Sequence, residues 1–147
     1  MSPILSKTEP DYLLLVEDNP DDELLITRAF GRQLDVNRIK VVHTGIEAVE
    51  FLERIKTASE LPKAVILDVN LPKKNGIDVL KAIRHNEKTK YLPVVMLTSS
   101  DEKRDLLDSY NLGANSYIRK PVNYEDFSRI IHEIGAYWLH INKPVSI

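Results

Sequence analysis

The sequence predicts an α/β fold in which a doubly wound, five-stranded parallel sheet is covered by five helices. Five apolar runs of strand length alternate with segments whose apolar residues recur at helical spacing. Several runs contain no polar residue, which is typical of strands buried on both faces by helices. The connections are short, as expected where right-handed crossovers join parallel strands. A chain of 147 residues most simply forms one such domain.

The first strand is expected at Tyr12–Val16, because this apolar run ends abruptly on acidic residues. Pro20, with acidic residues behind it, favours the start of a helix. The apolar residues of that helix lie at helical spacing: Leu24, Leu25, Ala29, Phe30 and Leu34. A second strand is expected at Ile39–His43, and Thr44-Gly45 leads into a second helix. One face of this second helix carries Ala48, Leu52 and Ile55.

The central strand is the uninterrupted apolar run Ala64–Leu67, which stops at Asp68. Asn75-Gly76 then makes a turn into a third amphipathic helix. A fourth strand is expected at Pro93–Leu97, before Thr98, and a fourth helix at Asp101–Leu112, closed by Gly113. The fifth strand is Ser116–Arg119. The last helix carries an apolar stripe of six residues: Phe127, Ile130, Ile131, Ile134, Trp138 and Ile141.

Composition narrows the functional classes. The chain has no cysteine, which excludes disulfides and thiolate metal sites and agrees with a reducing, cytoplasmic location. Its formal charge of −2 indicates neither nucleic acid nor an anionic membrane as a partner. No apolar run approaches the length of a membrane span. We expect a loose tail at 1–10, one domain at 11–141 and a short tail at 142–147.

Polar residues follow the strands at the point where each strand ends. Parallel strands share one carboxyl edge, so these side chains are expected to lie together. Their positions are Glu17 and Asp18, Asp68, Thr98 and Lys120. Three carboxylates at one edge repel one another unless a cation lies among them. Mg²⁺ suits this set, because it binds oxygen and takes only one or two carboxylates directly.

A carboxylate beside Mg²⁺ and a lysine can accept a phosphoryl group, because both cations offset the charge on the transferring oxygens. Asp68, at the end of the central strand, is the candidate acceptor. Thr98 is placed to donate a hydrogen bond to a phosphoryl oxygen. Taken singly, Asp68 also fits a turn and Thr98 a helix cap. The convergence of these residues on one edge favours the chemical interpretation.

These residues resemble the receiver domain of two-component response regulators, the CheY-like fold, from about Tyr12 to about His140. The resemblance rests on several motifs: Val16-Glu17-Asp18, Leu67-Asp68-Val69-Asn70-Leu71-Pro72, Gly76, Thr98-Ser99, Gly113–Tyr117 and Lys120-Pro121. It implies the strand order 2-1-3-4-5 of flavodoxin-like sheets.

The resemblance also implies roles. Asp68 would accept phosphate from a histidine kinase, and Asp18, Asp68 and the main-chain carbonyl of Asn70 would bind Mg²⁺. Glu17 would act through a metal-bound water. Lys120 would pair with the phosphoryl group, Thr98 would close on it, and Tyr117 would turn inward. A cis bond between Lys120 and Pro121 is also implied. The protein would then be a switch without small-molecule turnover of its own.

A narrower resemblance is to the stand-alone regulators of bacterial phytochrome-type histidine kinases. It rests on Val16–Asp22, Asn70–Gly76 and the late Trp138. By analogy it implies a homodimer through the last helix, which would bury Trp138 and Ile141. Output would pass from the fourth helix, fifth strand and fifth helix to another protein, or phosphate would be relayed to a phosphotransfer protein.

Two other classes compete with this interpretation. A Mg²⁺-dependent phosphohydrolase of the haloacid-dehalogenase type also forms an aspartyl phosphate, but it usually has a second Asp where this chain has Asn70. A flavin- or nucleotide-binding module would need a Gly-, Ser- and Thr-rich phosphate loop after the first strand. That loop is acidic here, from Glu17 to Asp22, and would repel a phosphate.

Overall fold

The fold is a parallel five-stranded sheet with the strand order β2-β1-β3-β4-β5, as the sequence predicts. It is taken from a computed structural model that describes residues 11–33 and 38–145. The expected tail at 1–10 and Leu34 lie outside these residues. The strands are β1 (Leu13–Val16), β2 (Ile39–Val42), β3 (Ala64–Leu67), β4 (Val94–Thr98) and β5 (Ser116–Arg119). The helices are α1 (Pro20–Gln33), α2 (Gly45–Arg54), α3 (Gly76–His85), α4 (Lys103–Asn111) and α5 (Tyr124–Ala136), with a 3-10 turn η2 (Ala58–Glu60) and a π-helical turn η3 (Tyr137–Ile141).

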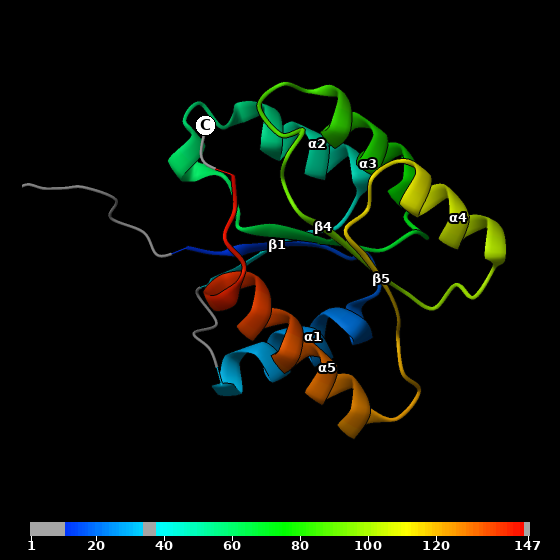
Figure 1. The fold of residues 1–147 in the computed structure, drawn as a ribbon. Coiled ribbons are helices and arrows are strands. Elements are labelled where there is room, and N and C mark those ends of the chain that lie inside the picture. Colours follow the sequence, from blue (N-terminus) through cyan, green and yellow to red (C-terminus); the bar gives the residue numbers. More distant parts are fainter. Residues whose placement is uncertain (1–10, 34–37, 146–147) are drawn as a thin grey trace, which may run out of the picture.

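The sheet separates two helical layers (Figure 1). Helices α1 and α5 lie on one face, and α2, α3 and α4 lie on the other. Alternate residues of β1 point to opposite layers: Leu14 and Val16 belong to the core under α2 and α3, while Leu13 and Leu15 belong to the core under α1 and α5. All four residues are buried. This two-sided burial is the reason why the strand contains no polar residue.

Side-chain caps set where the helices begin. The Asn19 side-chain oxygen accepts hydrogen bonds from the main-chain N–H groups of Asp21 and Asp22, at 2.9 and 3.1 Å. The same kind of cap starts three other helices, at Thr44, Asn75 and Asn123. Such caps satisfy N–H groups that have no partner within the helix. In α1 the cap also fixes the first turn next to the end of β1.

The first helix buries a stripe that differs slightly from the expected one. Ile26, Ala29 and Phe30 are buried, whereas Leu24 is 48% exposed.

Among residues 11–33 and 38–145, no helix is long and apolar enough to cross a membrane.

The last helix departs from the predicted stripe at its end. Phe127, Ile131 and Ile134 are buried as expected, but Ile141 is 69% exposed and Leu139 is buried instead. The cause is η3, where the chain closes a wider turn and the Asn142 N–H donates to the Tyr137 carbonyl at 2.7 Å. A π turn holds more residues than an α turn and therefore rotates the side chains that follow it.

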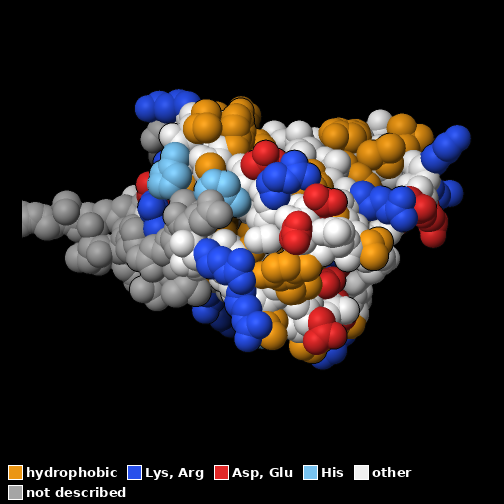
Figure 2. Space-filling model, turned by 90° about the horizontal axis from the view of Figure 1, so that it is seen from below, with side chains coloured by type: hydrophobic (Ala, Val, Ile, Leu, Met, Phe, Trp, Pro, Cys, Tyr) orange, Lys and Arg blue, Asp and Glu red, His pale blue; other side chains and the backbone are white. Residues whose placement is uncertain are grey.

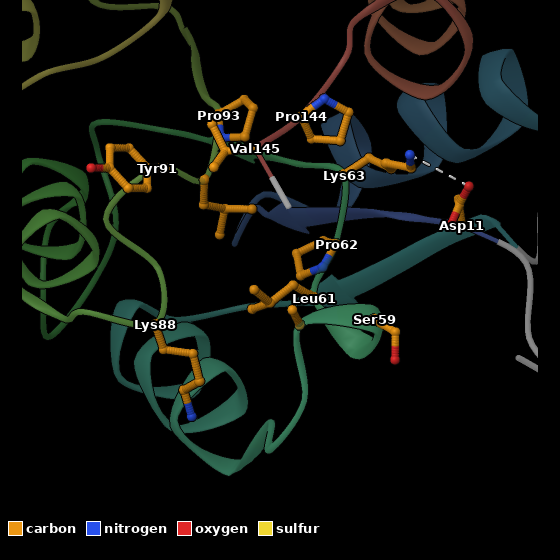
Figure 3. Close-up of a pocket in the computed structure, with 12 residues that line it drawn as sticks. Asp11, Ser59, Leu61, Pro62, Lys63, Lys88, Tyr91, Pro93, Pro144 and Val145 are labelled. Carbon is orange, nitrogen blue, oxygen red and sulfur yellow. Dashed lines mark ion pairs between the residues drawn. The ribbon is translucent and has the colours of Figure 1, made fainter. Parts of the chain in front are cut away.

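A pocket of about 400 Å³ lies at the amino edge of the sheet, away from the predicted site (Figure 3). It is lined largely by apolar residues, among them Leu61, Pro62 and Pro144, and the segment after η3 forms one of its walls. Its two labelled charged groups near β1, Lys63 and Asp11, pair with each other at 3.6 Å. The pocket contains none of the residues predicted to carry chemistry.

Candidate functional site

The sheet itself brings the predicted residues together, because its main-chain hydrogen bonds continue one residue beyond the strand ends. The Asp68 N–H donates to the Val16 carbonyl at 3.3 Å, and the Lys120 N–H donates to the Thr98 carbonyl at 2.8 Å. In the same way, the Glu17 N–H donates to the carbonyl of Val42, the last residue of β2, at 3.1 Å. Each of these three side chains is therefore held at the carboxyl edge by main-chain contacts on a neighbouring strand.

The Lys120 ammonium is the centre of the site. Its Nζ lies 2.7 Å from Glu17 Oε1, 2.9 Å from Asp68 Oδ2 and 2.7 Å from Asp22 Oδ2. The Lys120 and Glu17 side chains are only 5% and 1% exposed. The predicted meeting of Glu17, Asp68 and Lys120 is thus present in the structure.

Asp22 was not among the predicted site residues. The sequence places it in the acidic first turn of α1, where acids commonly stabilise a helix start. Its position four residues after Asp18, in the helix turn that follows the end of β1, was the available signal. Whether its side chain would turn inward depends on how α1 sits against β5, which residue spacing does not encode.

The carboxylates also form a group that suits a metal ion. One oxygen each from Glu17, Asp18 and Asp68 lies within 4.8 Å of the others. Glu17 and Asp68 are buried, whereas Asp18 is exposed. Hard carboxylate oxygens with an open, solvated side match what Mg²⁺ or Mn²⁺ requires. The residues present therefore fit a hard divalent cation.

The loop after β3 supports Asp68 from behind. The Asn70 N–H donates to Asp68 Oδ1 at 3.0 Å, so the Asn70 main chain lies beside the carboxylate. The Gly76 N–H donates to the Val69 carbonyl at 2.9 Å and closes the loop. A Cβ on Gly76 would lie 2.1 Å from the Asp68 carbonyl oxygen, so only glycine fits there.

Burial dominates the electrostatics of Glu17. Removal from water raises the pKa of Glu17 from 4.5 to about 7, because it outweighs the opposing contact with Lys120. Burial alone would lower the pKa of Lys120, but its bonds to Asp22 and Glu17 and the charge of Asp68 raise that pKa above its usual value. Lys120 is therefore a permanent cation at neutral pH.

Thr98 and Tyr117 lie beside this centre without a hydrogen bond to it. Thr98 is fully buried at the end of β4, and its Oγ1 accepts from the Ser100 N–H at 3.2 Å. The Tyr117 hydroxyl donates to the Ser100 carbonyl at 3.1 Å. Both side chains thus contact the segment that leads into α4.

The expectation of a cis bond between Lys120 and Pro121 is wrong: no peptide bond in the described part of the chain is cis.

Comparison with known proteins gives a family match over most of the chain. The model of the response regulator receiver domain matches residues 13–132. The probable methanogenesis regulatory protein FilR2 of Methanothrix harundinacea is 39% identical over 141 residues, which cover 95% of this chain and 91% of FilR2. The response regulator Rcp1 of Synechocystis is 34% identical over 88% of this chain and 90% of Rcp1.

Two solved structures share the fold closely. Phosphorylated RcpA, a cyanobacterial phytochrome response regulator, superposes with a TM-score of 0.84 at 33% identity, covering 94% of this chain and all of RcpA. The Mn²⁺-bound form of Rcp1 superposes with a TM-score of 0.83 at 31% identity, covering 93% of this chain and all of that one. The first structure carries a phosphoryl group and the second a divalent cation.

Proposed function

We propose that Asp68 accepts a phosphoryl group from a sensor histidine kinase, because the chain belongs to the response regulator receiver domain family. As a family member the protein is a phosphoacceptor switch and not a catalytic enzyme. The single observation that carries the proposal is the position of the Asp68 carboxylate, 2.9 Å from Lys120 Nζ and within the group of metal-suited carboxylates.

In the transfer step, an Asp68 oxygen forms the new O–P bond as the P–N bond of phosphohistidine breaks, and the imidazole nitrogen keeps the electron pair. Lys120 offsets the negative charge on the transferring oxygens. Asp18, Asp68 and the Asn70 carbonyl would hold Mg²⁺, with Glu17 acting through a water. When bound, the ion would supply positive charge in addition to that of the Lys120 ammonium. The Mn²⁺-bound relative supports this assignment.

The switch would work through the β4–α4 connection. A phosphoryl group adds roughly 1.5 to 2 negative charges at the loop and offers new acceptors to Thr98. When Thr98 moves toward it, Tyr117 would turn inward and give up its bond to the Ser100 carbonyl. The output face would comprise α4, β5 and α5. On α4, three large apolar side chains are 41 to 60% exposed: Leu106, Leu107 and Tyr110.

The names of relatives of this chain support the proposed partners. RcpA is a phytochrome response regulator, so we propose a phytochrome-type histidine kinase as the phosphodonor. A cytoplasmic location would allow this encounter. The receiver unit is assigned to 11–141, between flanking segments 1–10 and 142–147. A downstream protein or a phosphotransfer protein would read the phosphorylated state.

A homodimer through the end of the last helix is the second element of the proposal. Ile141 in η3 is 69% exposed and its neighbour Tyr137 is 44% exposed. Trp138, which was also expected in the interface, is instead partly buried against the core under α1 and α5. Hydrophobic side chains reach the surface in separate groups on the α1 and α5 side of the molecule (Figure 2). A second copy of the chain that covered Tyr137 and Ile141 would remove these two side chains from water.

The primary test is phosphorylation by a small donor. Acetyl phosphate with Mg²⁺ should add one phosphoryl group, detected by intact mass, and EDTA or Asp68→Asn should abolish the addition. Asp78→Asn, which changes an exposed Asp on α3, is the matched control and should leave phosphorylation unchanged. Unchanged phosphorylation of Asp68→Asn would refute the acceptor assignment. Steady phosphate release from many small phosphoesters would instead indicate a hydrolase.

A further inference from the structure

The ammonium of Lys120 has no hydrogen-bond donor to spare. A lysine ammonium carries three N–H groups, and Lys120 directs them at the carboxylates of Glu17, Asp22 and Asp68. A phosphoryl group on Asp68 brings further acceptor oxygens to the same ammonium. Lys120 can bind them only if one of its present partners gives way.

The three partners are not equally easy to release. Glu17 has a side chain only 1% exposed, and its second oxygen accepts from the Asn19 N–H at 3.2 Å. Asp68 carries the proposed phosphoryl group itself and has a side chain only 7% exposed, so it stays next to Lys120. Asp22 has a side chain 23% exposed and, within the part of the chain that the structure describes, its carboxylate bonds Lys120 alone.

Asp22 also keeps a favourable place after release. It lies in the first turn of α1, where the free N–H groups and the helix dipole stabilise a negative charge. Water can reach its carboxylate, whereas release of Glu17 would leave a buried acid with fewer partners. The exchange that costs least therefore replaces Asp22.

We propose that Asp22 is a positioning residue that occupies the third donor of Lys120 in the unphosphorylated protein and yields it to the phosphoryl group. This inference rests on the proposed function of Asp68 and Lys120 and adds a residue to it. Asp22 then competes directly with phosphorylation.

The experiment compares Asp22→Asn with Asp21→Asn. Both variants remove one negative charge from the first turn of α1. Of the two carboxylates, that of Asp22 bonds Lys120, whereas that of Asp21 is exposed to solvent. The probe is beryllofluoride with Mg²⁺, a phosphoryl mimic whose binding is followed by fluorine NMR. A second readout is the rate of phosphorylation by acetyl phosphate. Asp22→Ala is the second variant, and urea unfolding checks that each protein folds.

Asp22→Asn and Asp22→Ala should bind beryllofluoride about three- to tenfold more tightly than wild type, the size expected when one competing hydrogen bond is removed. Both should be phosphorylated faster, whereas Asp21→Asn should match wild type. Equal gains in Asp22→Asn and Asp21→Asn, or weaker binding in Asp22→Asn, would overturn the inference. A wild-type protein that neither binds beryllofluoride nor becomes phosphorylated would instead overturn the proposed function.

Discussion

The Tyr117 hydroxyl donates to the main-chain carbonyl of Ser100 at 3.1 Å and so ties β5 to the segment between β4 and α4. Tyr117→Phe keeps the ring and removes this bond. We expect a loss of about 0.5–1.5 kcal/mol in the free energy of unfolding, the usual value for one hydrogen bond. The rate of phosphorylation by acetyl phosphate should not change, because the hydrogen bonds that the Lys120 and Asp68 side chains make within the described residues do not involve Tyr117. Urea unfolding and intact mass measure the two effects.

Tyr110→Phe is the control for that change, because Tyr110 is a half-exposed tyrosine on α4. Its unfolding free energy should stay within about 0.5 kcal/mol of wild type. A phosphorylation rate that fell in Tyr117→Phe but not in Tyr110→Phe would contradict this expectation and mean that the Tyr117 hydroxyl influences the acceptor site.

The buried Glu17 predicts a pH dependence of stability in metal-free protein. Its pKa is about 7 in the folded chain and 4.5 when unfolded, so between these values the folded state binds more protons. The stability that Glu17 contributes is therefore present at low pH and lost as the pH rises toward 7, with a slope of at most about 1.4 kcal/mol per pH unit. Glu17→Gln should remove this decline.

The measurement is urea unfolding in EDTA from about pH 5 to about pH 8, with the wild type compared with Glu17→Gln at each pH. Glu47→Gln, at an exposed glutamate of α2, is the control and should follow the wild-type curve. If the unfolding free energy of wild type did not fall relative to that of Glu17→Gln as the pH rises, Glu17 would not carry a raised pKa in the folded chain.

Gly76 is expected to tolerate no side chain. The Cβ of Gly76→Ala would lie 2.1 Å from the Asp68 carbonyl oxygen and 2.8 Å from Val69 Cα, and main chain cannot swing aside as a flexible side chain can. We expect a loss of about 1–3 kcal/mol or more in unfolding free energy, together with slower phosphorylation because the Asp68 loop shifts.

Gly31→Ala is the matched control for that substitution. Gly31 is an exposed residue near the end of α1, where alanine favours helix over glycine by about 0.5–1 kcal/mol. The two alanine substitutions should therefore change stability in opposite directions. Equal stability of Gly76→Ala and wild type in urea would contradict the close approach of Gly76 to the Asp68 main chain.

Most of the fold follows from features that the sequence displays directly. The run Ala64–Leu67 is apolar because helices cover both of its faces, so its burial and its parallel neighbours could be predicted. Asp68 and Lys120 could be predicted for the same reason, since residues at the carboxyl ends of parallel strands reach one edge. Their roles remain predictions until phosphorylation is measured.

The missed features depend on distances between elements. Asp22 joins the site because α1 places its first turn beside the end of β5. Gly45 is needed because a Cβ there would lie 2.0 Å from the Lys74 carbonyl, on a loop 29 positions later. Neither approach leaves a periodic pattern in the sequence. The exposed Ile141 was predicted to be buried because helical spacing assumes a regular turn, which η3 does not have.

The π-helical turn η3 gives the last prediction. Leu139 is 6% exposed and packs with the α1 and α5 core, whereas Ile141 is 69% exposed. Leu139→Ala should lower the unfolding free energy by about 2–5 kcal/mol, because it leaves a cavity in that core. Ile141→Ala should change the unfolding free energy of the monomer by no more than about 0.5 kcal/mol. A regular α-helix would give the opposite order.

The same pair of variants separates folding from self-association. If η3 forms a homodimer interface, Ile141→Ala should weaken the dimer in sedimentation experiments and leave the stability of dilute protein unchanged, because Ile141 is covered only by a second copy. Leu139→Ala should destabilise the protein at every concentration, since its contacts lie within one chain. A concentration-independent loss of stability in Ile141→Ala would mean that this side chain is buried in the monomer, and that the wider turn after Ala136 is absent.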